Sequence, residues 1–209
     1  MRNLLLAMLL TLLAASCAQT SAPVSEGDAA LSVIMNRRSV RTFSGEKLSQ
    51  DQIEVLLKAA MAAPTDGNVQ PWEFVVVTDK DVVEAVFGQG HRADMYRNAG
   101  AVIIVCGHTT RLQIPRGEPD AAPVETPNGS WYEDCSCAAE NLLLAAEAQG
   151  LGAVWMSAYP NEQKMAGIVE YFHLPTDVLP LAIIPVGYPA GDEQPKDKWA
   201  PEKVHYNKW

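Results

Sequence analysis

The spacing of hydrophobic and polar residues predicts helices that alternate with short strands along most of the chain. The strongest helical pattern spans residues 131–149, where Ala and Leu dominate, and Gly150 is expected to end this helix as its C-terminal cap. A second helix is expected after Ser49, because Ser49 and Gln52 have the spacing of a capping box ahead of an apolar helical repeat, and Pro64 should stop it. Further helices are predicted near residues 31–36, 79–86, 94–98 and 161–171.

Runs of β-branched and aliphatic residues predict four strands, near residues 73–78, 101–106, 153–157 and 181–186. The 101–106 run is apolar on both faces, which predicts a central strand in a covered sheet. Pro and Gly interrupt residues 108–130, so we expect a long loop there that covers a functional site. Residues 188–209 have no apolar period and are predicted to be an arm outside the core. Strands interleaved with helices indicate a mixed fold of α and β layers.

The first residues of the chain have the pattern of an export signal. A positive start, an apolar run and small residues ending at Cys17 are typical of a signal peptide with a bacterial lipobox. The apolar run of about 10 residues is too short to span a bilayer. We therefore expect 1–16 to be a signal peptide, 17–27 a flexible tether after a lipidated Cys17, and 28–209 one domain, anchored to a membrane and facing the periplasm or the outside. The alternative is a buried N-terminal helix in a cytoplasmic protein.

Composition narrows the function classes. A hydrophobic content of 48% with 20% charged residues is typical of a compact globular protein. The formal net charge of -9 argues against nucleic acid as a partner, since phosphate backbones require a basic surface. Besides Cys17, the chain has Cys106, Cys135 and Cys137, which we expect to be small buried residues. The spacing of the last two suits neither a metal site nor a disulfide within one helix, so no metal is predicted.

Four segments in a fixed order carry the chemistry. They are Arg37-Arg38-Ser39-Val40-Arg41-Thr42-Phe43, residues 62–74 with the sequence Ala-Ala-Pro-Thr-Asp-Gly-Asn-Val-Gln-Pro-Trp-Glu-Phe, residues 150–158 with Gly-Leu-Gly-Ala-Val-Trp-Met-Ser-Ala, and residues 185–189 with Pro-Val-Gly-Tyr-Pro followed by Pro195-Lys196-Asp197-Lys198. Together they resemble the nitroreductase family over essentially the whole mature chain. The resemblance implies an α+β fold with a mostly antiparallel central sheet flanked by helices. It also implies a homodimer that exchanges its C-terminal arms and binds FMN.

Positive side chains stand out in this acidic chain. A flavin phosphate carries close to two negative charges and requires several charged donors. The resemblance implies that two groups of residues, distant in sequence, meet at this phosphate. The alternative is ordinary solvated charge on a helix end and a tail. The two groups comprise Arg37, Arg38, Ser39 and Arg41 in the first segment and Lys196 and Lys198 in the last, the lysines being expected on one side of an extended strand.

The two middle segments are expected at the flavin ring. By resemblance, the 64–70 turn reaches the flavin from the partner subunit, and a backbone N–H near Ser157 points at flavin N5. The alternative for the turn is a helix stop that orients Trp72 into the core, and for Met156 it is plain core filling. The candidate ring contacts are Pro64, Thr65, Asp66, Asn68 and Gln70, with Met156, Ser157 and Ala158.

No side chain presents itself as a catalytic acid or base, which agrees with chemistry carried by a cofactor. The resemblance implies an FMN-dependent oxidoreductase that passes electrons from NAD(P)H to a nitroaromatic, quinone or similar acceptor in a ping-pong reaction. Alternatives are a specialised flavin enzyme of the same fold, such as a dehalogenase, a non-enzymatic flavin-binding electron carrier, and a structural lipoprotein that has lost its cofactor. An exported domain would also meet little NAD(P)H, so another electron donor stays open.

Overall fold

A computed structural model describes residues 25–209 of the chain. The predicted signal peptide and Cys17 lie outside these residues. The first described helix, α2 (Glu26–Asn36), begins earlier than the predicted start at residue 31, and none of its side chains is buried. Ser25 initiates it by accepting the N–H of Asp28 at 3.1 Å. Within the described part of the chain, no helix is long and apolar enough to cross a membrane.

Residues 33–209 are organised around a five-stranded antiparallel sheet. The strands lie in the order β1 (Trp72–Val77), β2 (Ala101–His108), β7 (Val178–Gly187) and β5 (Gly152–Ala153), and β6 (Met156–Ser157) also pairs with β7. β2 is buried from Ala101 to Gly107, as its unbroken apolar pattern predicted. The α+β class with a mostly antiparallel sheet is therefore confirmed.

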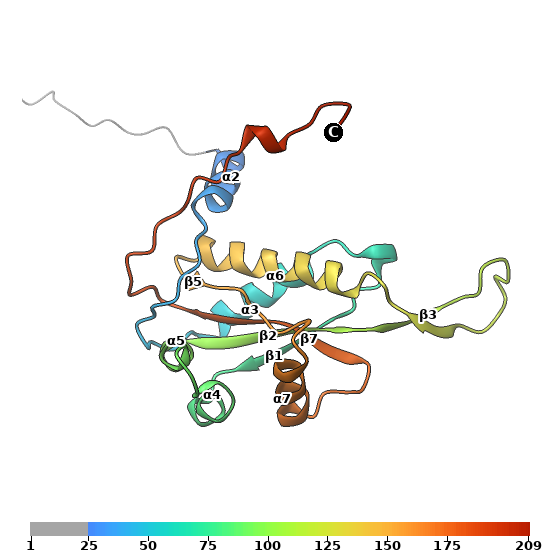
Figure 1. Ribbon diagram of the computed structural model, residues 1–209, viewed down its shortest axis with the longest axis horizontal. Coiled ribbons are helices and arrows are strands. Elements are labelled where there is room, and N and C mark those ends of the chain that lie inside the picture. The colour runs from blue at the N-terminus through green and yellow to red at the C-terminus, as the bar shows by residue number, and fades with distance from the viewer. Residues whose placement is uncertain (1–24) are drawn as a thin grey trace, which may run out of the picture. The chain divides into compact units, whose positions relative to one another are not determined.

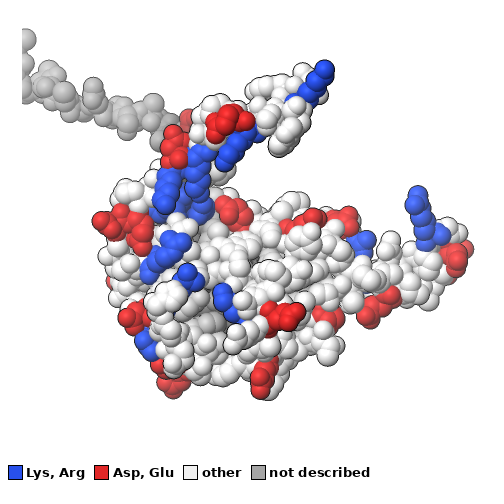
Figure 2. Space-filling model, in the orientation of Figure 1, with Lys and Arg blue, Asp and Glu red and all other residues white. Residues whose placement is uncertain are grey.

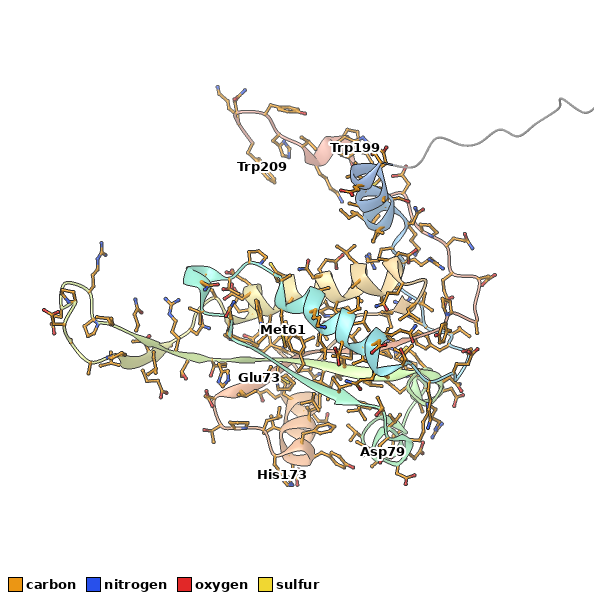
Figure 3. All side chains as sticks on the ribbon, turned by 180° about the vertical axis from the view of Figure 1, so that it is seen from behind. Met61, Glu73, Asp79, His173, Trp199 and Trp209 are labelled. Atoms are coloured by element: carbon orange, nitrogen blue, oxygen red, sulfur yellow. The ribbon has the colours of Figure 1, made fainter. Side chains whose placement is uncertain are left out.

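Helices cover both faces of this sheet (Figure 1). The first face carries α3 (Gln50–Met61) and α6 (Trp131–Ala148), and the second carries α4 (Lys80–Phe87), α5 (Ala93–Asn98) and α7 (Glu162–Phe172). In the view from behind, Met61 at the end of α3 and His173 after α7 lie on opposite sides of the sheet (Figure 3). Alternate residues of β2 contribute to the two cores, Ile103 and Val105 to the first and Val102 and Ile104 to the second.

Local capping signals fix the helix ends. Ser49 and Gln52 form both hydrogen bonds of the predicted capping box at the start of α3. Gly150, with φ +70°, follows the last residues of α6, and its N–H donates to the Glu147 carbonyl at 2.9 Å. The left-handed conformation suits glycine and closes the helix as predicted.

The predicted long loop at 108–130 is wrong. β2 extends to His108, and residues 110–127 form an antiparallel hairpin of β3 (Thr110–Gln113) and β4 (Val124–Pro127), which reaches away from the main sheet (Figure 1). Most of the Pro and Gly residues lie in the connection between the two strands, where they interrupt no ladder. The strands carry exposed apolar side chains, with Leu112 74% exposed.

The predicted strand at 153–157 is divided in two. Val154 donates its N–H to the carbonyl of Pro185 in β7 at 3.3 Å. Pro185 has no N–H to return, so the ladder loses one bond between β5 and β6. The lysines of the last segment lie in coil, and the expectation of a strand there is wrong.

One cysteine also differs from expectation. Cys106 and Cys135 are buried, and burial raises the pKa of each thiol to about 12. Cys137 is exposed. It follows Cys135 by two positions in α6, a rotation of about 200°, which turns its side chain to the opposite side of the helix. Among residues 25–209, no group of three or more His, Cys, Asp or Glu side chains could hold a metal ion.

Candidate functional site

The two groups of positive residues, far apart in sequence, line one cavity of about 340 Å³, here called the cation cavity. Figure 2 shows Lys and Arg side chains gathered on this part of the surface. The cavity brings together all six residues that the sequence assigned to a phosphate, with two neighbours from the arm. Its lining consists of Arg37, Arg38, Ser39, Arg41, Glu193, Gln194, Lys196 and Lys198.

The positive charges in the cavity are not equivalent. Nη1 of Arg38 lies 3.0 Å from a carboxylate oxygen of Glu147, and Nε of Arg37 lies 3.4 Å from Glu140, both acids belonging to α6. Arg41, Lys196 and Lys198 form no ion pair with any carboxylate of the described chain. These three cations therefore hold charge that is still available to a bound anion.

Glu193 is a residue of this cavity that sequence reasoning missed. Its Oε1 accepts the backbone N–H groups of Arg41 at 2.9 Å and Thr42 at 3.2 Å, while its Oε2 is buried without a hydrogen-bond partner in the described chain. Burial acts to raise the pKa of Glu193, but the backbone N–H groups outweigh it and hold this pKa below its usual value. An ionised Glu193 thus ties the arm to the segment that carries Arg41. No sequence motif marks Glu193, because a single Glu in a coil segment is common on protein surfaces.

The segment that carries Arg37, Arg38 and Arg41, here called the cation segment, runs beside β5. This strand leads to Ser157, which was expected at the flavin ring. Val40 donates its N–H to the Ala153 carbonyl at 3.0 Å, next to a parallel bridge between Ser39 and Ala153. Four residues further on, at a strand rise of about 3.3 Å each, Ser157 lies roughly 13 Å away. The cavity and Ser157 are therefore connected by one extended segment that could support an elongated ligand.

Only some of the residues in this segment face the α6 side of the sheet. Met156 and Ala158 are buried in the second core, against α4, α5 and α7. Trp155 and Ser157 point the other way, and Trp155 Nε1 donates to Ser157 Oγ at 3.1 Å. A ligand on the α6 side could reach Met156 and Ala158 through the backbone alone.

The 64–70 segment forms a tight turn with a 3-10 helix, η1 (Asp66–Asn68). Asn68 and Gln70 have φ values of +57° and +52°, a conformation that side-chain-bearing residues rarely adopt, and the Gln70 N–H donates to Thr65 Oγ1 at 3.2 Å. Asp66 is occupied on both sides, since its N–H donates to Asp134 Oδ1 at 3.0 Å and its carboxylate accepts from Arg111 at 2.8 Å. The turn is held in place by α6 and the hairpin.

Within one chain, this turn contacts the start of α6, whereas the residues of the cation cavity contact the middle and the end of that helix. Asp66 contacts Asp134 in the first turn of that helix, whereas Arg38 contacts Glu147 near its end. At 1.5 Å per residue, these two contacts are about 20 Å apart along the helix axis. A single chain therefore brings together the cations and the β5–β6 segment, and no residue of the 64–70 turn lines the cation cavity.

The fold and this site define an α+β protein with a cationic cavity that continues along one strand edge. Comparison with known proteins agrees with that class. The family described as Nitroreductase matches residues 34–94 and 84–188. A relative from Archaeoglobus fulgidus, provisionally named NADH dehydrogenase/NAD(P)H nitroreductase, is 35% identical over 182 residues, covering 86% of this chain and 98% of its own.

Solved structures give the same result. A protein from Bacteroides thetaiotaomicron, also provisionally named NADH dehydrogenase/NAD(P)H nitroreductase, superposes with a TM-score of 0.75 at 43% identity over 87% of this chain and 98% of its own. A provisionally named nitroreductase from Desulfovibrio desulfuricans, solved in complex with FMN, has a TM-score of 0.67 at 26% identity over 91% of this chain and 99% of its own. The chain belongs to the nitroreductase family and is an oxidoreductase of that family.

Proposed function

We propose that the chain binds FMN, with the flavin phosphate in the cation cavity. The residues present fit this group. Five cationic side chains line the cavity against one acidic side chain, Glu193, in a protein of net charge -9. Arg41, Lys196 and Lys198 have no carboxylate partner in the described chain, and an FMN phosphate carries close to two negative charges. This gathering of cations is the observation that carries the proposal.

The β5–β6 segment would support the flavin ring. Trp155 and Ser157 present their side chains on the α6 side of the sheet, next to the chain that leads from the cavity. A backbone N–H near Ser157 would hydrogen-bond to flavin N5. The buried side chains of Met156 and Ala158 would anchor β6 in the core and so hold this N–H in position. The protein would thus bind and orient the flavin rather than supply an acid or base.

The 64–70 turn would complete the site from a second copy of the chain. It contacts α6 at Asp134, about 20 Å along the helix from the Arg38–Glu147 contact and about 9 Å from the Arg37–Glu140 contact, and the family resemblance assigns it to the flavin of the other subunit. Pro64, Thr65, Asp66, Asn68 and Gln70 would instead border the partner's flavin. The C-terminal arm has exposed Trp199, at 73%, and Trp209, at 102%, which project from it (Figure 3), and in an exchanged dimer they would be covered.

The proposed reaction transfers electrons from NAD(P)H to a nitroaromatic, quinone or similar acceptor. When bound, FMN supplies the redox chemistry by taking a hydride from one substrate and reducing another after the first product has left. The names of the Archaeoglobus fulgidus and Bacteroides thetaiotaomicron relatives support the choice of donor and acceptor class. The chain's own residues would bind the cofactor, orient the ring and admit the substrates in turn.

Stopped-flow reduction of the purified protein, lacking residues 1–16, tests this function. Mixing with NADH or NADPH should bleach the flavin absorbance, and mixing the reduced protein with a quinone or nitroaromatic should restore it. A protein that purifies without flavin and cannot take it up would contradict the cofactor assignment. A coloured protein that is reduced but shows no steady turnover with any acceptor would favour the alternative of a flavin-binding electron carrier, and turnover confined to a halogenated substrate would favour a dehalogenase.

We also propose that the domain is exported and anchored by lipid at Cys17. The sequence pattern of residues 1–17 supports this localisation. Cys17→Ala should move the protein from the membrane fraction to the soluble fraction. Continued membrane association of the variant would contradict the anchor. If export holds, scarce external NAD(P)H makes a membrane-linked electron carrier the alternative donor.

A further inference from the structure

A second cavity lies on the side of the sheet away from α6. Its volume is about 470 Å³, and the connection between α4 and α5 borders it on one side and α7 on the other. It shares no lining residue with the cation cavity. Met156 contributes to its floor, and the exposed Ser157 next to it points to the opposite side of the sheet. This second cavity is therefore separate from the proposed flavin site.

The floor of the second cavity is apolar and suited to a planar ring. Met156 and Ile183 come from the sheet, and Phe87 and Tyr96 stand beside them as a stacked pair with ring centroids 4.8 Å apart. Aromatic rings and a methionine sulfur both pack favourably against another aromatic ring. An apolar ligand would be shielded from water here. A planar aromatic ligand would make more contacts with the floor than an aliphatic one.

The rim of the cavity is cationic. Lys164 and Arg92 supply the charge, the His91 side chain also lines the cavity, and no Asp or Glu belongs to the lining. Lys164 Nζ is held by the Ser157 carbonyl at 3.2 Å, which uses one of its three donors and fixes the ammonium at the rim. Arg92 forms no ion pair with an acid of the described chain. In a protein of net charge -9, a cavity with positive and no negative lining favours an anion.

Gly167 is a second, independent sign that this space is kept open. It lies inside α7, where glycine costs about 1 kcal/mol relative to alanine. At Gly152, by contrast, packing requires glycine, since a Cβ would lie 2.6 Å from Val40. A Cβ at Gly167 would meet no heavy atom within 4 Å, although the residue lines the cavity. Packing therefore does not require glycine at 167, and the missing side chain leaves the α7 side of the cavity open.

We propose that this second cavity binds a small aromatic monoanion, such as an aromatic carboxylic acid. The ring lies over Met156 and Ile183 beside the Phe87–Tyr96 pair, and the carboxylate meets Lys164 and Arg92. The bare surface of α7 at Gly167 admits the ring. The site is separate from the proposed flavin site and does not depend on it.

Calorimetric titration of the full chain with 2-naphthoate tests the proposal, with 2-naphthamide as the neutral probe of the same shape. Saturable binding of one naphthoate per chain is expected, at least about tenfold tighter than the amide. Gly167→Leu should weaken naphthoate binding by about tenfold or more, and Gly167→Ala by less. Lys164→Gln and Arg92→Gln should each weaken the acid but leave the amide unchanged.

Matched controls separate this site from the flavin site. Lys58→Gln removes an exposed cation from α3, on the other side of the sheet, and should leave naphthoate binding unchanged. Gly167→Leu should keep the flavin content and thermal midpoint of the unmodified chain. No saturable binding, equal binding of acid and amide, or full binding by Gly167→Leu would each overturn the proposal. The titration contains no electron donor. A failure of flavin reduction would therefore not change how the naphthoate binding result is interpreted.

Discussion

Arg38 and Glu147 form a part-buried ion pair, in which Nη1 of the arginine lies 3.0 Å from one carboxylate oxygen and 3.1 Å from the other. The pair joins the cation segment to the end of α6. Arg41, three residues later, has no carboxylate partner in the described chain, and its Nη1 donates to the Ser39 carbonyl at 3.3 Å. The two arginines of this motif therefore differ in role. Arg38 stabilises the fold through its ion pair, whereas the charge of Arg41 is available to a bound anion.

Substitution of these two arginines should separate stability from cofactor binding. Arg38→Ala leaves Glu147 without its partner and should lower the free energy of unfolding by about 1–2 kcal/mol. Arg41→Ala should change that free energy by less than about 0.5 kcal/mol but weaken FMN binding by about tenfold or more. Urea unfolding and flavin fluorescence titration measure the two effects. Equal flavin affinity in Arg41→Ala and the unmodified chain would contradict the phosphate role.

The two lysines of the arm provide a second test of the cavity. Replacing Lys196 and Lys198 together by Gln removes two unpaired cations and should weaken FMN binding by about tenfold or more, without lowering the thermal midpoint. Lys203→Gln is the matched control, since Lys203 lies on the same arm but outside the cavity. Similar flavin affinity in the double variant and the control would place the phosphate elsewhere.

Gly152 should tolerate no side chain. A Cβ at this position would lie 2.6 Å from the Cβ of Val40, which is fully buried. Gly152→Ala should therefore destabilise the chain by about 1–3 kcal/mol through overpacking. Gly129→Ala is the control, because no atom lies within 4 Å of its added Cβ. In a double variant with Val40→Gly, which removes all three crowding atoms of Val40, the total loss should be smaller than the sum of the two single losses; simple addition would argue against the contact.

The His108 cluster should give stability a pH dependence. His108 Nδ1 lies 2.7 Å from Asp177 Oδ2, and its Nε2 lies 3.4 Å from Glu73 Oε1. The hydrogen bond to Asp177 raises the pKa of His108 above 6.5 and lowers the pKa of Asp177 below 3.8. The raised pKa means that the His108 contribution is fully present below pH 6.5 and is lost as pH rises through the folded-state value.

The contribution of Asp177 to stability depends on pH in the opposite direction. Because the pKa of Asp177 is lowered, its contribution is present above 3.8 and is lost as pH falls through the folded-state value. His108→Asn should therefore reduce the free energy of unfolding more at pH 5.5 than at pH 8.5. Urea unfolding at the two pH values checks this, and a loss equal at both would show that the imidazole charge contributes nothing.

Features fixed by neighbours in sequence could be predicted in detail. Ser49 with Gln52, Asp79 and Gly150 mark helix ends through hydrogen bonds that span a few residues, so the sequence contains both partners of each contact. Central placement of β2 followed in the same way from its own apolar run. The gathering of the two cation groups in one cavity was expected only through the family resemblance, since no local rule joins residue 41 to residue 196.

Features fixed by distant partners were missed. The hairpin at 110–127 is held beside the 64–70 turn by Arg111 and Asp66, which are 45 positions apart in sequence. The break between β5 and β6 depends on Pro185 in another strand, and Cys137 depends on how α6 is rotated against the sheet. Glu193 acts through backbone N–H groups more than 150 positions away. Each needed a tertiary contact that no motif encodes.

The distance along α6 between the 64–70 turn and the cation cavity also bears on inheritance. If each flavin uses the cavity of one chain and the turn of the other, chains that are each impaired in a different half of the site can restore activity to one another when co-expressed. Random pairing of equal amounts of Arg41→Ala and Asn68→Ala chains would leave about one quarter of all sites without a lesion. A site confined to a single polypeptide would give no more activity in the mixture than in the separate variants, so a gain on co-expression would support the shared site.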